Sequence, residues 1–471
     1  MGVLSSLSYT DNVGAASVNV NDDWVLNVTP WLRTRKEYGR LTGSVDARLR
    51  TLTFADETDR NTAFVILNGR GVFEAVDNVL FIDGEARIGR ENRSAFVGRN
   101  ELGLLDADDE NEIRTFRLGP RLEFRPFGET DALLAYHHRW LNGGGEIVGR
   151  EIGVVDAKLE NPHAYGPWGW NAEYRREHTQ YDLAEIEDVI REDARIRGQH
   201  AITPRLVVAV LGGWERNDFG FGDKRDDTIY GAGFGWRPSP RTEFIGVVEE
   251  RFFGTGYNLD LTHRRARTRW QFTALRQVAS AADEYTGVES DALFQRFYDD
   301  LSGISDPVAR EEEARRRTDQ ALAQSIGPFS TNHYFLSQEL GFGFSWSGRR
   351  TVLAVNARQG HRTRLGQVFT QDGRDDLSTY RRVNTRSLAV SLNRRVTPQT
   401  TAQLTASYRD SEGLGDDQTE SERYLLGVGV STRFGPNTTG GLSYQHDRLE
   451  GRGAARDYRE NTVTANLGVR F

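Results

Sequence analysis

Cysteine is absent from the chain, and methionine occurs only once in 471 residues. Without cysteine the chain can form neither a disulfide nor a thiolate metal site, and this absence suits an oxidising compartment, where unpaired thiols are a liability. No apolar run approaches the ~18 residues that a membrane-spanning helix needs, which excludes a helical membrane protein. The N-terminal residues MGVLSSLSYTDNV have neither the basic nor the apolar region of a signal peptide. We therefore expect Met1 to stand where a signal peptide has been removed.

Proline is also scarce, with 12 residues, whereas glycine is abundant, with 49. The aromatic residues comprise 9 tryptophans, 16 tyrosines and 24 phenylalanines, and 27% of the chain is charged. A transmembrane β-barrel can be this polar on average, because only every second residue of a strand faces lipid. The aromatic residues would form belts at the two membrane interfaces. Composition alone does not separate such a barrel from a soluble protein.

The last nine residues give the clearest signal, because they alternate strictly between polar and apolar side chains. An amphipathic strand that ends on a C-terminal aromatic residue is typical of outer-membrane β-barrels, and the barrel-assembly machinery of Gram-negative bacteria recognises that end. We therefore predict a location in the bacterial outer membrane, in contact with its lipid and lipopolysaccharide, with Phe471 as the assembly signal. The apolar face of this strand consists of Val463, Ala465, Leu467, Val469 and Phe471.

The same alternation recurs along the chain, with aromatic residues on one face and arginines on the other. It is clear in the segments 116–124, 168–175, 230–237, 340–346 and 424–434. Short connections with turn residues are predicted to face the periplasm: 37–40, 76–78, 126–130, 203–205, 239–241, 347–349, 397–400 and 435–438. Longer acidic connections are predicted to face outside: 93–111, 217–227, 363–378, 410–420 and 447–458.

These patterns predict an all-β fold, with residues 1–471 as a single transmembrane antiparallel up-and-down β-barrel of about 20 strands (range 18–22). Counting gives about 21 candidate strands, yet closure with both termini in the periplasm requires an even number. One strand is therefore misassigned, and tracing from both ends places the error between residues 240 and 331. That stretch holds a hairpin at 252–258, a long segment at 259–277 and a part that does not alternate.

The non-alternating part, 280–327, is predicted to be a helical or irregular insert. Ser305, Asp306 and Pro307 form a helix start, and the sequence VAREEEARRRTDQALAQ that follows favours helix. It has no strong apolar stripe. It could be a plug or constriction in the lumen, a surface domain, or a loop that hides one more short strand.

A charged lumen is the main chemistry that the sequence offers. If the aromatic faces contact lipid, the opposite faces carry charge inward, and such charges set ion preference in a pore and can bind anionic sugars. Because both signs occur, these residues could instead neutralise one another in a filled interior. The predicted lumen-lining residues are Arg117, Arg121, Glu123, Arg125, Arg139, Glu173, Arg175, Arg237, Arg350, Arg358 and Arg433.

Other chemistry has little support in the sequence. His137, His138 and His263 lie in no nucleophile motif, so we do not expect an enzyme. The loop 105–112 offers Asp106, Asp108 and Asp109 as weak Ca²⁺ candidates, but Asn111 stands where an EF-hand loop needs glycine. We favour a solvated loop and expect no bound metal or cofactor. A net charge of -8, with basic residues dispersed among acids, argues against nucleic-acid binding.

Three segments carry a family resemblance: SYTDNV at 8–13, the strand ending in TP at 29–30, and RFFGTGYNLDLTHRRARTRW at 251–270. They resemble the outer-membrane barrel proteins associated with PEP-CTERM/exosortase and exopolysaccharide loci, which are relatives of the β-barrel porin 2 group. The resemblance implies an outer-membrane location and a link to polymer or protein export, but no transported substrate.

Two functions follow from these observations. The first is a channel or conduit, with a polysaccharide or an export-system protein as partner. The alternative is a non-conducting structural or docking barrel, whose lumen is filled by the insert or by a partner protein. An outer-membrane enzyme is the least favoured possibility.

Overall fold

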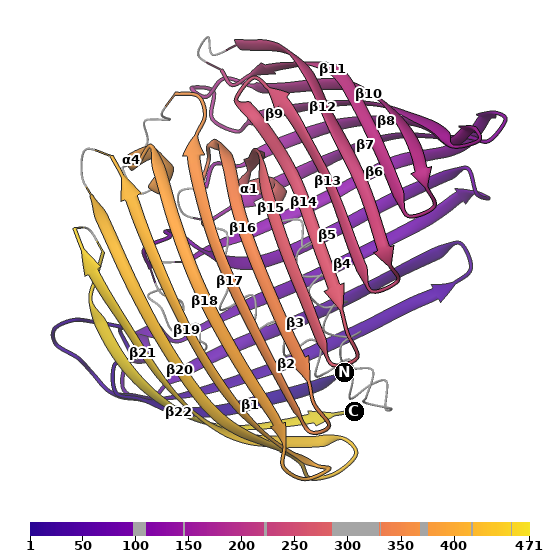
Figure 1. Ribbon diagram of the computed structural model, residues 1–471. Coiled ribbons are helices and arrows are strands. Elements are labelled where there is room, and N and C mark those ends of the chain that lie inside the picture. Colours follow the sequence, from indigo (N-terminus) through magenta and orange to yellow (C-terminus); the bar gives the residue numbers. More distant parts are fainter. Residues whose placement is uncertain are drawn as a thin grey trace.

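The computed structural model describes residues 1–97, 110–144, 147–220, 224–284, 329, 331–367, 375–415, 418–453 and 455–471. Most of this part of the chain is β-structure (Figure 1). The strands are β1 (Gly2–Thr10), β2 (Asp23–Tyr38), β3 (Leu41–Phe54), β4 (Thr62–Val76), β5 (Leu80–Asn92), β6 (Glu110–Phe127), β7 (Thr130–Gly143), β8 (Arg150–Tyr165), β9 (Trp168–Tyr181), β10 (Val189–Thr203), β11 (Leu206–Asp218), β12 (Lys224–Ser239), β13 (Thr242–Arg251), β14 (Gly254–Arg264), β15 (Thr268–Ser280), β16 (Tyr334–Ser347), β17 (Thr351–Arg364), β18 (Arg382–Arg395), β19 (Thr400–Leu414), β20 (Thr419–Arg433), β21 (Thr438–Arg452) and β22 (Tyr458–Arg470).

The strands form one closed antiparallel barrel. Each strand pairs with its neighbours in sequence, and β1 pairs with β22 from Gly2 opposite Arg470 to Thr10 opposite Thr462. A closed barrel leaves no strand edge unpaired, as a wall in lipid requires. The predicted fold class is confirmed, and the described part of the chain contains 22 strands.

The strand that sequence counting missed lies in the segment 259–277. This segment holds the end of β14 and most of β15, joined by a turn at residues 265–267 in which the Arg265 amide donates to the Thr268 carbonyl oxygen at 2.7 Å. The turn contains no glycine, proline or asparagine, so it carries none of the residues by which turns are usually recognised. The error in the count therefore fell within the region that the topology had identified.

The two ends of the barrel differ in their connections. All eight predicted short turns lie at the end that also carries both chain termini, which we call the short-turn end (Figure 1). Three of them use residues with positive φ: Gly39 at 71°, Asn78 at 57° and Gly128 at 54°. The predicted longer connections join strands at the opposite end, which we call the long-loop end. This asymmetry is the one expected of a membrane barrel.

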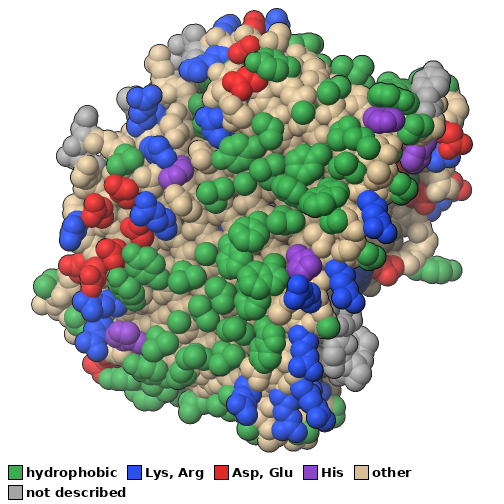
Figure 2. All heavy atoms as spheres, in the orientation of Figure 1, with side chains coloured by type: hydrophobic (Ala, Val, Ile, Leu, Met, Phe, Trp, Pro, Cys, Tyr) green, Lys and Arg blue, Asp and Glu red, His purple; other side chains and the backbone are tan. Residues whose placement is uncertain are grey.

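Large apolar side chains are exposed on the outer face of the wall. Phe272, Leu340 and Val428 are 49%, 47% and 43% exposed, and Figure 2 shows an apolar band across one side of the molecule with charged groups at both of its ends. A soluble protein rarely exposes an apolar surface of this extent. The strands therefore have one face suited to lipid and one suited to the lumen.

Three short helical turns accompany the strands within the described ranges: η1 (Thr58–Arg60), α1 (Ala281–Glu284) and α4 (Asp376–Thr379). No helix in these ranges is long and apolar enough to span a membrane. The predicted insert at 280–327 lies outside the described residues from residue 285 onward, so its helix remains a prediction.

Candidate functional site

The inner face of the wall carries ion pairs between neighbouring strands. On β5 and β6, Arg121 Nε lies 2.8 Å from Asp83 Oδ2, and Arg117 Nη2 lies 3.1 Å from Glu85 Oε2. Arg121 also pairs with Glu123 on its own strand. Each arginine of this group is thus balanced by an inward carboxylate.

A second group, on β8, β9 and β10, is centred on Glu177. Its carboxylate lies 3.3 Å from both Arg175 Nη2 and Arg191 Nη1, and Arg175 Nη1 is 3.5 Å from Asp156 Oδ1. Glu177 is 3% exposed, so its charge is withdrawn from water and depends on these partners.

A third group crosses from β10 to β13. Arg195 Nη2 lies 3.4 Å from Glu249 Oε1 although two strands separate them, and Arg251 bonds both Glu249 and Glu215. Gly213, on one of the intervening strands, leaves the inner face clear near Arg195, with which it is paired in register. Together the three groups make a charged but paired inner wall from β5 to β13.

The residues predicted to line the lumen fall into two sets. Within the inner wall lie Arg117, Arg121, Glu123, Arg139, Glu173, Arg175 and Arg358, on β6, β7, β9 and β17. At the short-turn rim lie Arg125, which pairs with Asp131, Arg237, which pairs with Glu243, and Arg433 at the end of β20; Arg350 lies in a turn, outside any strand. Their effect on ion preference stays a prediction.

Sequence reasoning missed most of the carboxylates and several arginines of this network. The acids comprise Asp83, Glu85, Asp156, Glu177, Asp193, Glu215 and Glu249, and the missed arginines are Arg191, Arg195 and Arg251. The period-two pattern could have found them, because residues 189–197 alternate Val, Arg, Asp, Arg, Arg on one face. The aromatic marker used to assign faces is absent from that segment.

The chain that leaves β15 enters the barrel. Ala282 of α1 packs against Ile113, Leu141, Ile152 and Val154 on the inner faces of β6, β7 and β8. The Arg139 Nη1 group donates to the Ala282 carbonyl oxygen at 3.0 Å. The first described residues of the predicted insert therefore lie against the lumen wall at the long-loop end.

The chain that returns to β16 crosses to the same wall. We call residues 331–333 the crossing segment. The Arg150 guanidinium, 1% exposed, donates to the carbonyl oxygens of Thr331 and Asn332 at 3.4 and 3.5 Å. Tyr181 Oη donates to the Asn332 carbonyl oxygen at 3.2 Å, and the Val148 amide donates to Asn332 Oδ1 at 3.0 Å. Strands β8 and β9 thus hold the crossing segment although it belongs to a distant part of the barrel.

Two adjacent aspartates of the β17–β18 loop hold the crossing segment from its other side. Asp375 Oδ2 accepts hydrogen bonds at 2.9 Å from Thr331 Oγ1 and from the Asn332 amide. Asp376 Oδ2 accepts from the Ala95 amide at 2.6 Å and from Ser94 Oγ at 3.1 Å. The two carboxylates therefore connect three loops in the mouth of the barrel.

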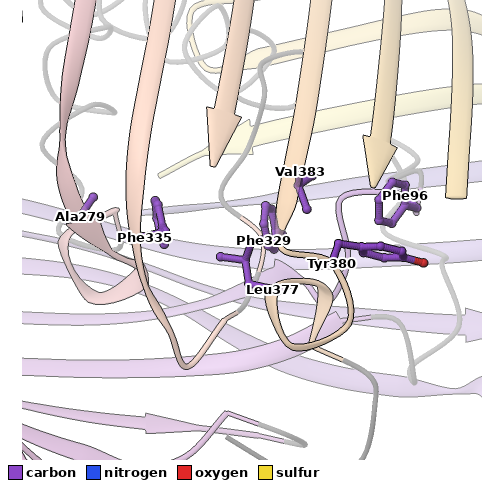
Figure 3. Packing of buried hydrophobic residues seen from close by; sticks show 7 residues of the cluster. All are labelled: Phe96, Ala279, Phe329, Phe335, Leu377, Tyr380 and Val383. Atoms are coloured by element: carbon purple, nitrogen blue, oxygen red, sulfur yellow. The ribbon is translucent and has the colours of Figure 1, made fainter. Parts of the chain in front are cut away.

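Apolar side chains from these loops and from the adjoining ends of β15, β16 and β18 fill the space between them. The mouth cluster consists of Phe96, Ala279, Phe329, Phe335, Leu377, Tyr380 and Val383, and Figure 3 shows these side chains gathered where the loops meet. A second contact joins walls that are not neighbours in the sheet, because Val278 and Tyr334 of β15 and β16 pack with Tyr181 and Val189 of β9 and β10. The described loops thus constrict the long-loop end.

Burial perturbs the ionisable groups of this mouth. It raises the pKa of Asp376 to about 7, against the opposing effect of the Ala95 and Ser94 hydrogen bonds, and it also raises the pKa of Asp375. Burial, with the charges of Arg364 and Arg150, lowers the pKa of His333 to about 3. The imidazole is therefore neutral at ordinary pH and bonds Ser378 Oγ through Nε2 at 2.9 Å.

The remaining predicted sites are the weak Ca²⁺ candidates and the C-terminal phenylalanine. Asp106, Asp108 and Asp109 lie outside the described residues. Within the described ranges, no three His, Asp or Glu side chains gather in a way that could hold a metal ion. Phe471 closes the chain with its amide donating to the Met1 carbonyl oxygen at 2.9 Å, while its side chain is 76% exposed.

Comparison with known proteins supports the fold alone. No protein-family model matches the sequence, and neither does any curated protein. A mutant of the ferric enterobactin receptor PfeA from Pseudomonas aeruginosa is similar, with a TM-score of 0.50 and 10% identity over 100% of this chain and 80% of that chain. The FrpB iron transporter from Neisseria meningitidis gives 0.49 and 8% over 99% and 82%, and the outer membrane protein OpdK from Pseudomonas aeruginosa gives 0.36 and 8% over 99% and 97%.

Proposed function

We propose that the chain is an outer-membrane channel whose long-loop end is gated by the crossing segment and the mouth cluster. One observation carries the proposal: a closed ring of 22 strands has an apolar outer face and a charged inner face. A ring of this size encloses a lumen wide enough for water and solutes unless it is plugged. The short-turn end would face the periplasm.

The paired charges indicate what kind of channel this would be. Each of the three inner-wall groups joins arginines to carboxylates at close range, so little net charge faces the lumen along β5 to β13. We therefore expect weak ion selectivity, in contrast to pores whose lumen is lined by unbalanced rings of one sign. A reversal potential near zero in a salt gradient would support this, and strong anion selectivity would contradict it.

The test of the channel is conductance in planar bilayers. The intact protein is expected to open rarely, because the described loops constrict its mouth. A variant that lacks residues 285–328, rejoined by a short linker, should open more often or more widely. Silence of both proteins at all voltages, with both correctly folded, would contradict the channel.

A second candidate is a non-conducting docking barrel. It is favoured by the complete burial of Phe335 and Leu377 in the mouth, both 0% exposed, which is the packing of a closed structure. In this case the lumen would be filled by residues 285–328 or by a partner protein. Conductance steps of the intact protein would exclude it.

A finer proposal is that the barrel serves exopolysaccharide or protein export. Its support is the resemblance of residues 251–270 and of two short N-terminal segments to barrels of such loci. Deletion of the gene followed by measurement of secreted polysaccharide tests it. Unchanged secretion of both polymer and protein would remove the export role and leave the channel standing.

A further inference from the structure

The short-turn end carries an unbalanced group of arginines on one side of the barrel. They lie in or beside three consecutive turns, β14–β15, β16–β17 and β18–β19, and all are exposed. Figure 2 shows basic side chains gathered along the lower rim of the view, below the apolar band. We call this group the basic arc; it consists of Arg264, Arg265, Arg267, Arg349, Arg350, Arg394 and Arg395.

No acid balances the basic arc. The sequence has no Asp or Glu in residues 261–282, 340–371 or 377–409, which include all three turns. Among the described residues, none of the seven guanidinium groups takes part in an ion pair or a side-chain hydrogen bond. The arc is therefore a cationic surface facing outward from this rim.

Other parts of the same rim are balanced. Arg40 Nη2 lies 2.8 Å from Asp77 Oδ1, Arg125 Nε lies 2.6 Å from Asp131 Oδ1, and Arg35 pairs with Glu37. These residues are also exposed and also belong to short turns or strand ends. Because exposed cations elsewhere on this rim form ion pairs with acids, the absence of such pairs in the basic arc is a local property of these three turns.

Aromatic side chains place the arc at the level of lipid headgroups. Trp270 and Phe344 lie on the outer face with ring centroids 4.4 Å apart, and Trp346 is paired in register with Thr268 at the start of β15. Tryptophan on a lipid-facing wall marks the boundary between hydrocarbon and headgroups. Arg267 and Arg349 lie three residues from Trp270 and Trp346, on the turn side of each, so their side chains extend into the phosphate region.

We propose that the basic arc binds the phosphate groups of anionic phospholipid, such as phosphatidylglycerol or cardiolipin, in the leaflet at the short-turn end. This inference rests on the proposed function only in requiring that the barrel sits in a membrane. Guanidinium groups bond phosphate oxygens in pairs and keep their charge at any ordinary pH. Three neighbouring turns with two or three arginines each can engage several phosphates together. An acidic protein could meet the same charge, but the adjoining tryptophans favour lipid.

The experiment compares two charge-matched triple variants with the wild-type protein. The test variant is R265Q/R267Q/R349Q, and the control is R35Q/R40Q/R125Q, which removes three cations that already have acid partners. Each protein is purified in a neutral detergent and titrated with phosphatidylglycerol or phosphatidylcholine, and retained lipid is counted by native mass spectrometry. Heat-modifiable migration on gels confirms that each barrel is folded.

Wild type and control are expected to prefer phosphatidylglycerol by at least about tenfold, the scale reached when several arginines act together at an anionic surface. The preference should fall at least about threefold in the test variant and also in wild type at high salt. Equal retention of the two lipids by wild type, or an equal preference in test and control variants, would overturn the proposal. Conductance is measured on the same samples: lipid preference without conductance would overturn the channel alone, and conductance without lipid preference would overturn the arc alone.

Discussion

Replacement of Asp375 by alanine is expected to open the long-loop end of the barrel. The carboxylate is 8% exposed and accepts three hydrogen bonds, each of 2.9 Å, from Thr331 Oγ1, the Asn332 amide and the Leu377 amide. Two of these donors belong to the crossing segment and the third to α4. The side chain therefore ties the crossing segment to the β17–β18 loop, and alanine can replace none of these bonds.

The size of the effect follows from the number of bonds lost. A hydrogen bond contributes about 1 kcal/mol net, and more where its loss leaves a buried donor unsatisfied. Only the two bonds to the crossing segment are broken when the mouth opens, because Leu377 belongs to the same loop as Asp375. They contribute about 2 kcal/mol, which is about a 30-fold change in the ratio of open to closed mouths. Phe335 and Leu377 remain buried in the variant, so its mouth should still close for part of the time.

Single-channel recording in planar bilayers measures this ratio directly as the fraction of time spent open. The matched control is D23A, because Asp23 is 1% exposed and accepts from the amides of Ala55, Asp56 and Glu57 in a different loop of the same end. We expect D375A to open about 30 times more often than wild type, and D23A to resemble wild type. Equal opening of D375A and wild type, with both folded, would refute the reasoning; equal opening of the two variants would show a general loosening of loops instead.

Three further predictions concern other parts of the molecule. In R423A, Asp447, 1% exposed, loses a partner whose Nε lies 2.9 Å away, so the free energy of unfolding should fall by about 3–5 kcal/mol; an unchanged urea midpoint in micelles would contradict this. Burial raises the pKa of Asp376 from 3.8 to about 7, so its stabilisation of the closed mouth is complete below pH 3.8 and is lost as the pH rises through 7. His333 has a pKa lowered from 6.5 to about 3, so its contribution changes little above pH 6.5. Opening should therefore increase from pH 6.5 to 8 in wild type but not in D376N. In F471A the exposed ring is lost, so stability should change by less than about 0.5 kcal/mol while the amount assembled in the outer membrane falls; equal assembly in cells would argue against an assembly role.

The barrel could be predicted from sequence because its signal is local. Alternation over a single strand assigns its two faces, and turn residues such as Gly128 mark where the chain reverses. The missed turn at residues 265–267 shows the limit of this signal. Three residues of the sequence Arg-Ala-Arg can close a hairpin when both flanking strands are fixed in the wall, although nothing in their type requires it.

The constricted mouth could not be predicted in this way, because its contacts join residues that are far apart in the chain. Arg150 and Asn332 are 182 positions apart, and Ser94 and Asp376 are 282 positions apart. The alternation of side chains along the strand predicts that Arg150 faces the lumen, but it does not predict which carbonyl oxygens the guanidinium will contact. Likewise, a face assignment predicts that Arg195 points inward, yet its contact with Glu249 depends on the curvature of two intervening strands.

Pairing of the wall charges is a condition for closing the mouth. Tyr334 Oη donates to Glu177 Oε1 at 3.0 Å, and the Arg191 guanidinium lies 5.5 Å from the Tyr334 ring centroid. When Tyr334 packs here, it removes water from both charged groups. A single buried charge would then cost several kcal/mol, more than one hydroxyl hydrogen bond returns. Because Arg191 and Glu177 already pair with each other at 3.3 Å, and Arg175 adds a second bond, the charges stay compensated as water leaves. The ion pairs on this wall therefore stabilise the closed mouth, in addition to any contact that they make with a solute in the lumen. Removing Arg191 alone should weaken the packing of β16 against this wall.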